Sequence, residues 1–254
     1  MDKNDTILIH RFYDLAKKSN RSERVVFSNF LNLNEQNLLM EEKNNLEASF
    51  QLFGGFSNAE RQIACFQSDA FSLYNESELV YPIHCIHIWP ANKKFSEPVN
   101  HRDILGSLMH LGIERDQLGD IIVDESDIYV MCLKTACSLI LEDLYKIRHT
   151  QMRSEEIALR DFKFEPSFEE KTCQIASNRL DAFVASVCNL SRQKANEYIL
   201  SEKVFINSKL ITNLNASIKE NDVISLRGYG KLRIESFLGT TKKGKIRISY
   251  QLYT

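Results

Sequence analysis

Residues 179–211 read RLDAFVASVCNLSRQKANEYILSEKVFINSKLI and carry the strongest structural signal of this 254-residue chain. The first part has apolar residues at i, i+3, i+4 and i+7, which predicts a helix with one buried face. These residues are Leu180, Phe183, Val184 and Val187. Ser191 is placed to cap a second helix over 192–200, and an apolar strand over 203–206 turns tightly into a returning strand.

The start of the second predicted helix suits a phosphate group. Its free backbone N–H groups and the positive end of its dipole lie near Ser191. Arg192 and Lys194 belong to the same first turn, so their side chains reach the same surface. We therefore predict a phosphate-binding site there.

Further strands are predicted after this stretch, over 223–227, 231–235 and 245–248. In the second of them, alternation with a period of two puts Lys231 and Arg233 on a solvent face. Leu232 and Ile234 then face the core.

Charge divides the chain at residue 170. Residues 1–170 hold 18 Lys and Arg against 28 Asp and Glu, whereas residues 171–254 hold 14 against 6, a net charge of +8. A solvated basic face is the ordinary explanation of a single charge run, but a whole basic domain beside an acidic one favours a polyanionic partner. We therefore interpret the C-terminal part first as a nucleic-acid-binding domain.

The C-terminal residues carry a resemblance to a known family. Residues 179–211 and the later run NDVISLRGYGKL (221–232) resemble the RNA-binding domain named after ribosomal small-subunit protein four, here called the S-four domain. Ser208 and Asn221 stand at turn positions where that family usually has glycine. The resemblance makes Arg179 and Arg192 the leading RNA contacts. The full set of residues that we predict to bind RNA is Arg179, Ser191, Arg192, Lys194, Lys203, Asn207, Lys231 and Arg233.

The rest of the chain predicts an α+β protein with four segments. Residues 1–75 have apolar positions near helical spacing and predict a helical N-terminal domain. Residues 76–160 predict the order strand, helix, strand, strand, helix, strand, a ferredoxin-like pattern that several RNA-recognition modules share. Residues 161–178 are polar and predict a linker before the S-four domain at 179–254.

The central domain is a weak candidate for reading bases. RNA-recognition modules stack bases on aromatic residues of one strand, whereas the corresponding strand here, 127–133, offers only Tyr129. Because its flank is also acidic, we expect this domain to be a scaffold or a protein contact.

Upstream runs extend the resemblance over nearly the whole chain. FSNFLNLNEQ (27–36), FGGFSNAERQ (53–62) and HRDILGSLMHLGIERDQLGDIIV (101–123) resemble the bacterial YlmH family, in which an S-four domain ends a chain of this length. The resemblance implies an RNA-binding factor of ribosome-associated quality control. Such a factor acts on large subunits that hold a stalled peptidyl-tRNA while the nascent chain receives a non-templated tail, and it contacts large-subunit ribosomal RNA and tRNA. The family is also associated with a cell-division gene cluster.

Metal and disulfide chemistry have little support. His84 and His87 point to opposite faces of a strand, so we expect no metal site and no cofactor. The six cysteines form no C-x-x-C pair, and we expect all of them to be reduced and mostly buried.

Two other functions stay open. S-four domains also accompany RNA-modifying enzymes such as pseudouridine synthases, but the one R-L-D motif here, 179–181, is already part of the S-four helix. We therefore expect no enzymatic activity. The acidic N-terminal part could instead make the chain a protein adaptor at the division site. The start of the sequence lacks the pattern of a signal peptide, so we expect a cytoplasmic protein without a membrane partner. The resemblance implies that it is associated with the ribosome, and nothing in the sequence demands more than a monomer.

Overall fold

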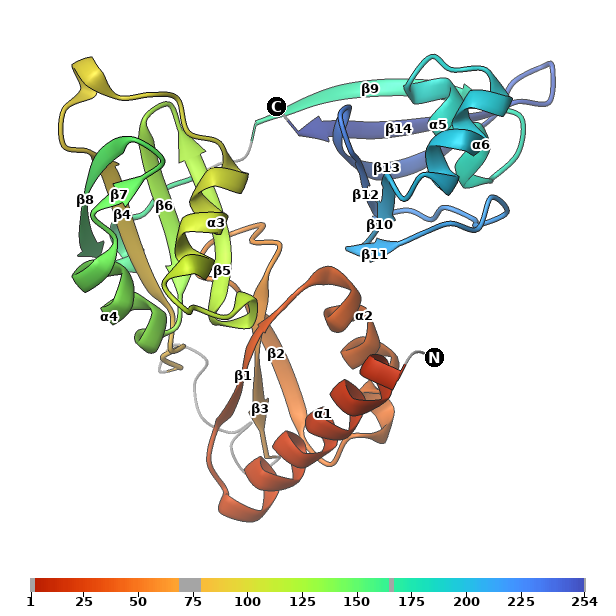
Figure 1. Ribbon diagram of the computed structural model, residues 1–254. Coiled ribbons are helices and arrows are strands. Elements are labelled where there is room, and N and C mark those ends of the chain that lie inside the picture. Colours follow the sequence, from red (N-terminus) through yellow and green to blue (C-terminus); the bar gives the residue numbers. More distant parts are fainter. Residues whose placement is uncertain (1–2, 69–78, 165–166, 254) are drawn as a thin grey trace. The chain divides into compact units, whose positions relative to one another are not determined.

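The computed structural model describes residues 3–68, 79–164 and 167–253, in two compact units, Met1–Phe164 and Glu165–Thr254 (Figure 1). Both units combine helices with sheets, so the α+β class is confirmed. No helix in the described ranges has the length and apolar character needed to cross a membrane.

The first unit begins with a three-stranded antiparallel sheet in the order β1-β3-β2. Helix α1 and helix α2 pack on it through Phe12, Leu39 and Phe66. The elements are α1 (Lys3–Ser22), β1 (Val26–Leu31), α2 (Leu33–Glu41), the 3-10 helix η1 (Lys43–Asn45), β2 (Ser49–Phe53) and β3 (Gln62–Gln67).

The prediction of a helical region over 1–75 is therefore wrong. Phe27, Phe30 and Leu31 stand near helical spacing but lie on β1. The pairing of β1 with β3 shifts register between Phe27 and Phe30, which breaks the period-two alternation that marks a strand. The predicted boundary at residues 75 and 76 lies outside the described residues.

The central part has the predicted ferredoxin-like topology. Its antiparallel sheet has the order β5-β6-β4-β8-β7, so the first and third strands of the motif are neighbours in the middle. The elements are β4 (His84–Pro90), η3 (Lys93–Phe95), α3 (His101–His110), η4 (Arg115–Gln117), β5 (Leu118–Asp124), β6 (Asp127–Cys132), α4 (Lys134–Asp143), β7 (Lys146–Ile147), β8 (Thr150–Ile157) and η5 (Leu159–Asp161). The side chain of Asn100 caps the start of α3.

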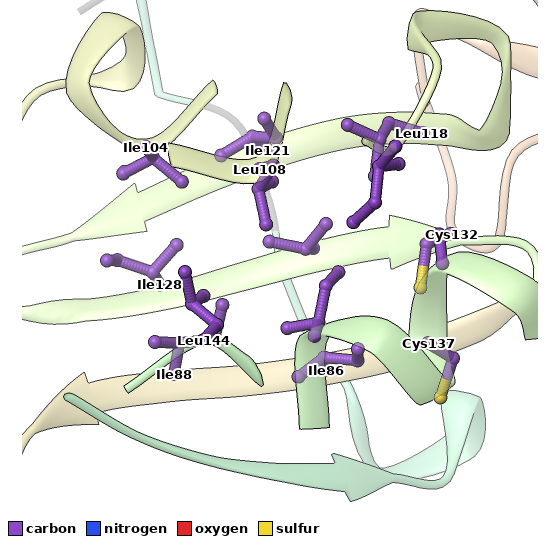
Figure 2. Packing of buried hydrophobic residues seen from close by; sticks show 14 of the residues in the cluster. Ile86, Ile88, Ile104, Leu108, Leu118, Ile121, Ile128, Cys132, Cys137 and Leu144 are labelled. Atoms are coloured by element: carbon purple, nitrogen blue, oxygen red, sulfur yellow. The ribbon is translucent and has the colours of Figure 1, made fainter. Parts of the chain in front are cut away.

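Helices α3 and α4 cover one face of this sheet. Ile104 and Leu108 of α3 pack on Ile86 and Ile128 of the strands in a continuous apolar core (Figure 2). Cys132 and Cys137 lie in the same core (Figure 2), and all six cysteines are free, four of them fully buried. The prediction that the cysteines are mostly buried is confirmed, and their reduced state stays a prediction.

The two sheets of the first unit share a second core on the other face of the central sheet. Phe30 and Ile63 pack there against Cys85 and Met131. The buried guanidinium of Arg61 donates to the carbonyl oxygens of Phe30 and Leu118, at 3.1 and 2.9 Å. Residues 3–68 and 79–164 therefore form one compact unit, although the sequence predicts two domains there.

The second unit is a six-stranded antiparallel sheet in the order β11-β10-β12-β13-β14-β9, with α5 and α6 packed on one face (Figure 1). The elements are β9 (Phe168–Ile175), α5 (Leu180–Val187), α6 (Arg192–Leu200), β10 (Val204–Ile206), β11 (Lys209–Leu210), β12 (Val223–Leu226), β13 (Gly230–Thr240) and β14 (Ile246–Tyr253). Their core contains the four apolar residues that predicted the first helix.

The linker predicted over 161–178 is wrong for residues 168–175. Phe168–Ile175 forms β9, which pairs with the whole of β14. This strand lies at the edge of the sheet, and Cys173 and Ile175 are the residues that it adds to the core. An edge strand with charged residues has no continuous apolar pattern, so its composition resembles that of a loop.

Candidate nucleic-acid interface

Arg179 and Arg192, predicted as the leading RNA contacts, meet at one buried carboxylate. Asp181 lies in the first turn of α5, and its side chain is fully buried. Arg179 donates from Nε to Oδ1 and from Nη2 to Oδ2 of Asp181, both at 3.0 Å. Arg192 donates from Nε to Oδ2 at 3.1 Å. The arginine side chains are 35% and 63% exposed, so the cluster presents two oriented guanidinium groups to solvent.

The cluster keeps a net positive charge. Burial on its own would raise the pKa of Asp181, but the hydrogen bonds and positive charges of Arg179 and Arg192 outweigh it and hold the pKa below its usual value. Asp181 is therefore ionised at neutral pH. Two arginines and one aspartate give a net charge of about +1 with fixed geometry, which suits a phosphate better than two mobile side chains do.

The start of α6 has the predicted arrangement. The Ser191 hydroxyl accepts a hydrogen bond from the backbone N–H of Lys194 at 3.3 Å, which makes Ser191 the N-cap. Ser191, Arg192 and Lys194 are exposed together in the first turn of α6. Lys203 follows the other end of this helix, with Nζ 5.5 Å from the centre of the Tyr198 ring. The start of α6 thus brings together three of the predicted residues, Ser191, Arg192 and Lys194. Lys203 lies elsewhere.

Asn207 has a role inside the protein. Its amide group donates to Asp222 at 2.9 Å, and its carbonyl oxygen accepts from the backbone N–H of Val223 at 2.9 Å. These bonds hold the turn between β10 and β11 against the start of β12. Ser208 and Asn221, where the family usually has glycine, have φ values of +67° and +68°, in the left-handed region that glycine favours. Both residues therefore adopt the backbone conformation that glycine usually supplies at such turns.

Lys231 and Arg233 lie on another surface. They alternate along β13 with Leu232 and Ile234, which are fully buried under α5 and α6 as predicted. Both basic side chains therefore project from the face of the sheet opposite the helices, and both are half-buried. Burial lowers the pKa of Lys231 to about 8. The predicted RNA-binding residues are consequently divided between two faces of the second unit.

Comparisons with known proteins agree with the resemblance. Residues 78–161 match the sequence model of a protein family described as "Putative RNA-binding domain in YlmH". The chain is 27% identical over 229 residues to "Ribosome-associated protein quality control protein P2" of Bacillus subtilis (strain 168), across 90% of this chain and 87% of that protein. The chain is therefore similar to YlmH proteins over most of its length. A solved structure, "Cell division protein ylmH from Streptococcus pneumoniae", is similar with a TM-score of 0.50 and 25% identity, over 63% of this chain and 95% of that chain.

These comparisons support an RNA-binding role for this chain. They also bear on the central domain, which we expected to be a scaffold or a protein contact, because the matched family model describes the corresponding residues as an RNA-binding domain. The expectation rested on finding one aromatic residue, Tyr129, on the corresponding strand and on the acidic flank of that strand. The structure places His87 in parallel stacking with Tyr129, with ring centres 4.8 Å apart, and Trp89 at 4.7 Å from His87.

These aromatic neighbours could have been found in the sequence. His87 and Trp89 are two residues apart on β4, and β4 lies beside β6 in the ferredoxin-like order. The surrounding charges are mixed, since His87 contacts Asp127 at 2.8 Å and Glu155 at 3.6 Å, and Lys93 pairs with Asp127 at 3.1 Å.

His84 lies near two potential metal ligands that come from distant parts of the chain. Single ligand atoms of His84, Cys137 and Glu156 lie within 4.8 Å of one another. The pair of His84 Nδ1 and Glu156 Oε1 is already in hydrogen-bond contact at 2.6 Å. The trio comes from β4, α4 and β8, so no spacing along the sequence could have predicted it. The expectation of no metal site stays a prediction.

Proposed function

We propose that this chain is a non-catalytic RNA-binding factor that acts as a monomer on stalled large ribosomal subunits. In this proposal it contacts large-subunit ribosomal RNA and tRNA while the nascent chain receives a non-templated tail. The pair of arginines held by Asp181, within residues 171–254 of net charge +8, is the observation that carries the proposal. The name of the relative from Bacillus subtilis supports the link to ribosome-associated quality control.

The geometry favours recognition of structured RNA through its backbone. Arg179 lies at the start of α5, and Arg192 and Lys194 lie in the first turn of α6. Backbone N–H groups of this turn that Ser191 does not cap point to the same surface. Contacts of this kind bind phosphates and supply affinity that falls with salt. Specificity would then come from the shape of the RNA, which is the usual basis for recognising folded RNA helices.

The absence of catalysis is part of the proposal. A pseudouridine synthase needs a catalytic aspartate in an R-L-D type motif, and the aspartate of this motif is Asp181. Its carboxylate is fully buried and accepts three hydrogen bonds from Arg179 and Arg192. A carboxylate neutralised and covered in this way is poorly suited to attack a base.

The test is co-sedimentation of the full chain with separated ribosomal subunits over a salt series. We expect salt-sensitive binding to large subunits that carry peptidyl-tRNA, weaker binding to empty large subunits, and a loss of at least tenfold in the variant Arg179→Ala/Arg192→Ala. For each phosphate that a variant no longer neutralises, the slope of log affinity against log salt should fall by about 0.7–0.9. The matched control is Lys17→Ala/Lys18→Ala on α1, which removes the same charge from two exposed positions.

A second variant separates binding from folding, because removing both arginines leaves the buried Asp181 carboxylate unpaired. Lys194→Glu changes an exposed side chain of the same surface and should also weaken binding. Binding of the wild type to neither subunit would refute the proposal. Equal binding by the wild type and Lys194→Glu, together with a folded double variant that still binds, would remove this surface from the interface.

A further inference from the structure

The sheet of the second unit has a face that α5 and α6 do not cover. The helices pack on the face that contains Ile224, Leu232 and Ile248, all fully buried. Side chains that alternate with these residues project from the opposite face, here called the open face. The open face spans strands from β10 to β9.

Strand register brings aromatic residues into one row across the open face. Phe205 of β10 is opposite Ser225 of β12, and Ser225 is opposite Lys231 of β13. The pairing of Leu232 with Leu252 continues the row to Tyr253 of β14. Tyr253 is in turn opposite Phe168 of β9, and the two rings meet edge to face with centres 4.9 Å apart. Phe205, Tyr253 and Phe168 are all half-buried, so part of each ring meets solvent.

Cations lie on these rings. The guanidinium carbon of Arg227 is 4.9 Å from the centre of the Phe205 ring, and Nζ of Lys231 is 5.3 Å from the centre of the Tyr253 ring. Arg233 follows Lys231 on the same face of β13. Basic residues of the open face outnumber acidic ones: Arg227, Lys231, Arg233 and Arg247 against Glu170 and Glu235.

We propose that the open face binds a short unpaired RNA strand, with bases stacked on Phe205 and Tyr253 and phosphates contacted by Arg227, Lys231 and Arg233. Aromatic side chains interleaved with cations are the combination that binds single-stranded nucleic acid, because every base has a flat face and every linkage a negative charge. A paired helix does not expose base faces, so this row selects unpaired RNA. The inference rests on the proposed RNA-binding function and adds a second site to it.

The two ends of the row are far enough apart for more than one nucleotide. Phe205 and Tyr253 are separated by three steps between neighbouring strands, about 14 Å at about 4.8 Å a step. A strand crossing this distance would pass over Ser225 and Lys231. The predicted RNA contacts Lys231 and Arg233, which lie away from the arginine pair of α5 and α6, thus belong to the site for unpaired RNA.

The experiment measures fluorescence anisotropy of a labelled ten-nucleotide oligouridine with the full chain. Phe205→Leu/Tyr253→Leu removes the rings and keeps apolar side chains, so we expect at least tenfold weaker binding of the oligouridine. The conservative pair Phe205→Tyr/Tyr253→Phe should bind like the wild type. Phe50→Leu, at a half-buried ring of β2, is the control for removal of an aromatic residue.

Charge is tested separately. Arg227→Gln should weaken oligouridine binding and reduce its salt dependence, whereas Lys242→Gln, at an exposed position, should have a smaller effect. Both sets of variants are also measured for binding to large ribosomal subunits, where the open-face changes should cost less than Arg179→Ala/Arg192→Ala.

Failure of this inference can be told from failure of the proposed function. Normal oligouridine binding by a folded Phe205→Leu/Tyr253→Leu variant would overturn the open-face site and leave the proposed function intact. A wild type that binds large subunits but not oligouridine would do the same. A wild type that binds neither would overturn both.

Discussion

Replacing Asp181 with asparagine distinguishes two explanations of RNA binding by the second unit. The substitution makes the unit more positive by one charge, so a mechanism based on total charge predicts tighter binding. It also disrupts the ion pairs that position Arg179 and Arg192, so a mechanism based on placement of the arginines predicts weaker binding. The two explanations therefore predict opposite changes in RNA affinity.

The size of the effect follows from the contacts of Asp181. Its carboxylate accepts three hydrogen bonds from the arginines and one from the backbone N–H of Ala182. Asparagine keeps one acceptor and turns an N–H group toward a guanidinium. Hydrogen bonds to charged groups contribute about 1.5–3 kcal/mol each, but hydration of the partly exposed arginines offsets much of this. We expect the free energy of unfolding to fall by about 2 kcal/mol, and RNA affinity to fall about tenfold, or about 1.4 kcal/mol.

The pH dependence of this destabilisation is defined by the lowered pKa of Asp181. A carboxylate whose pKa is lower in the folded state stabilises the fold above its unfolded pKa, and this contribution is lost as the pH falls through the folded value. The stability difference between the wild type and Asp181→Asn should therefore be full at neutral pH. It should shrink below about pH 4, near the ordinary pKa of an aspartate.

The assay combines urea unfolding of the full chain with filter binding to large-subunit ribosomal RNA at several salt concentrations. Circular dichroism follows both units, while fluorescence of Trp89, the single tryptophan, follows the first unit as an internal control. Glu197→Gln, at an exposed position of α6, adds the same charge without touching the arginines. If Asp181→Asn binds RNA as tightly as Glu197→Gln, placement of the arginines has no role and the reasoning is wrong.

Three further predictions concern positions elsewhere in the fold. Gly119→Ala should lower the free energy of unfolding, measured in urea, by about 1–3 kcal/mol, because a Cβ there would lie 2.6 Å from the Phe30 ring. Gly106→Ala, at an open position of helix α3, should instead raise the free energy of unfolding by up to about 1 kcal/mol. Burial raises the pKa of Asp120 to about 6, so its contribution to stability is full below about pH 4 and declines as the pH rises through 6; urea unfolding of Asp120→Asn should lack this dependence. Asn207→Ala should cost about 1–3 kcal/mol of stability, and its RNA affinity, measured where the variant is folded, should stay within about threefold of the wild type.

Where the sequence has a regular local pattern, it predicted the structure closely. The helix over 192–200 agrees with α6 residue for residue, because Ser191 marks its start as the N-cap. The edge strand β9 and the bulged strand β1 have no such pattern. Their pairing depends on partners far along the chain, β14 and β3, which a local period does not reveal.

The sequence predicted which residues form the candidate site better than it predicted how they are arranged. The family resemblance identified Arg179 and Arg192 as the leading RNA contacts, but the carboxylate that joins them could be recognised only after folding placed Asp181 between both. Alternation correctly assigned Lys231 to the face opposite the core residues Leu232 and Ile234, although its side chain is half-buried there. It could not show that this face is opposite the helices that carry the arginines, since that depends on which side of the sheet α5 and α6 pack.

The buried carboxylate of Asp181 lowers the positive charge that is available to bind RNA, but it fixes the positions of two arginine side chains. Asp181 occupies Nε and Nη2 of Arg179 and Nε of Arg192, and no hydrogen bond within the described residues uses the remaining N–H groups of these guanidinium groups. Those groups can therefore donate to phosphate oxygens from side chains that are already ordered, which lowers the entropic cost of binding. The negative charge of Asp181 opposes RNA binding, but it also holds the guanidinium groups of Arg179 and Arg192 in fixed directions. On this reasoning, affinity for RNA in this chain depends on where its arginines point more than on the net charge of +8, and Asp181→Asn is the substitution at which the two quantities change in opposite directions.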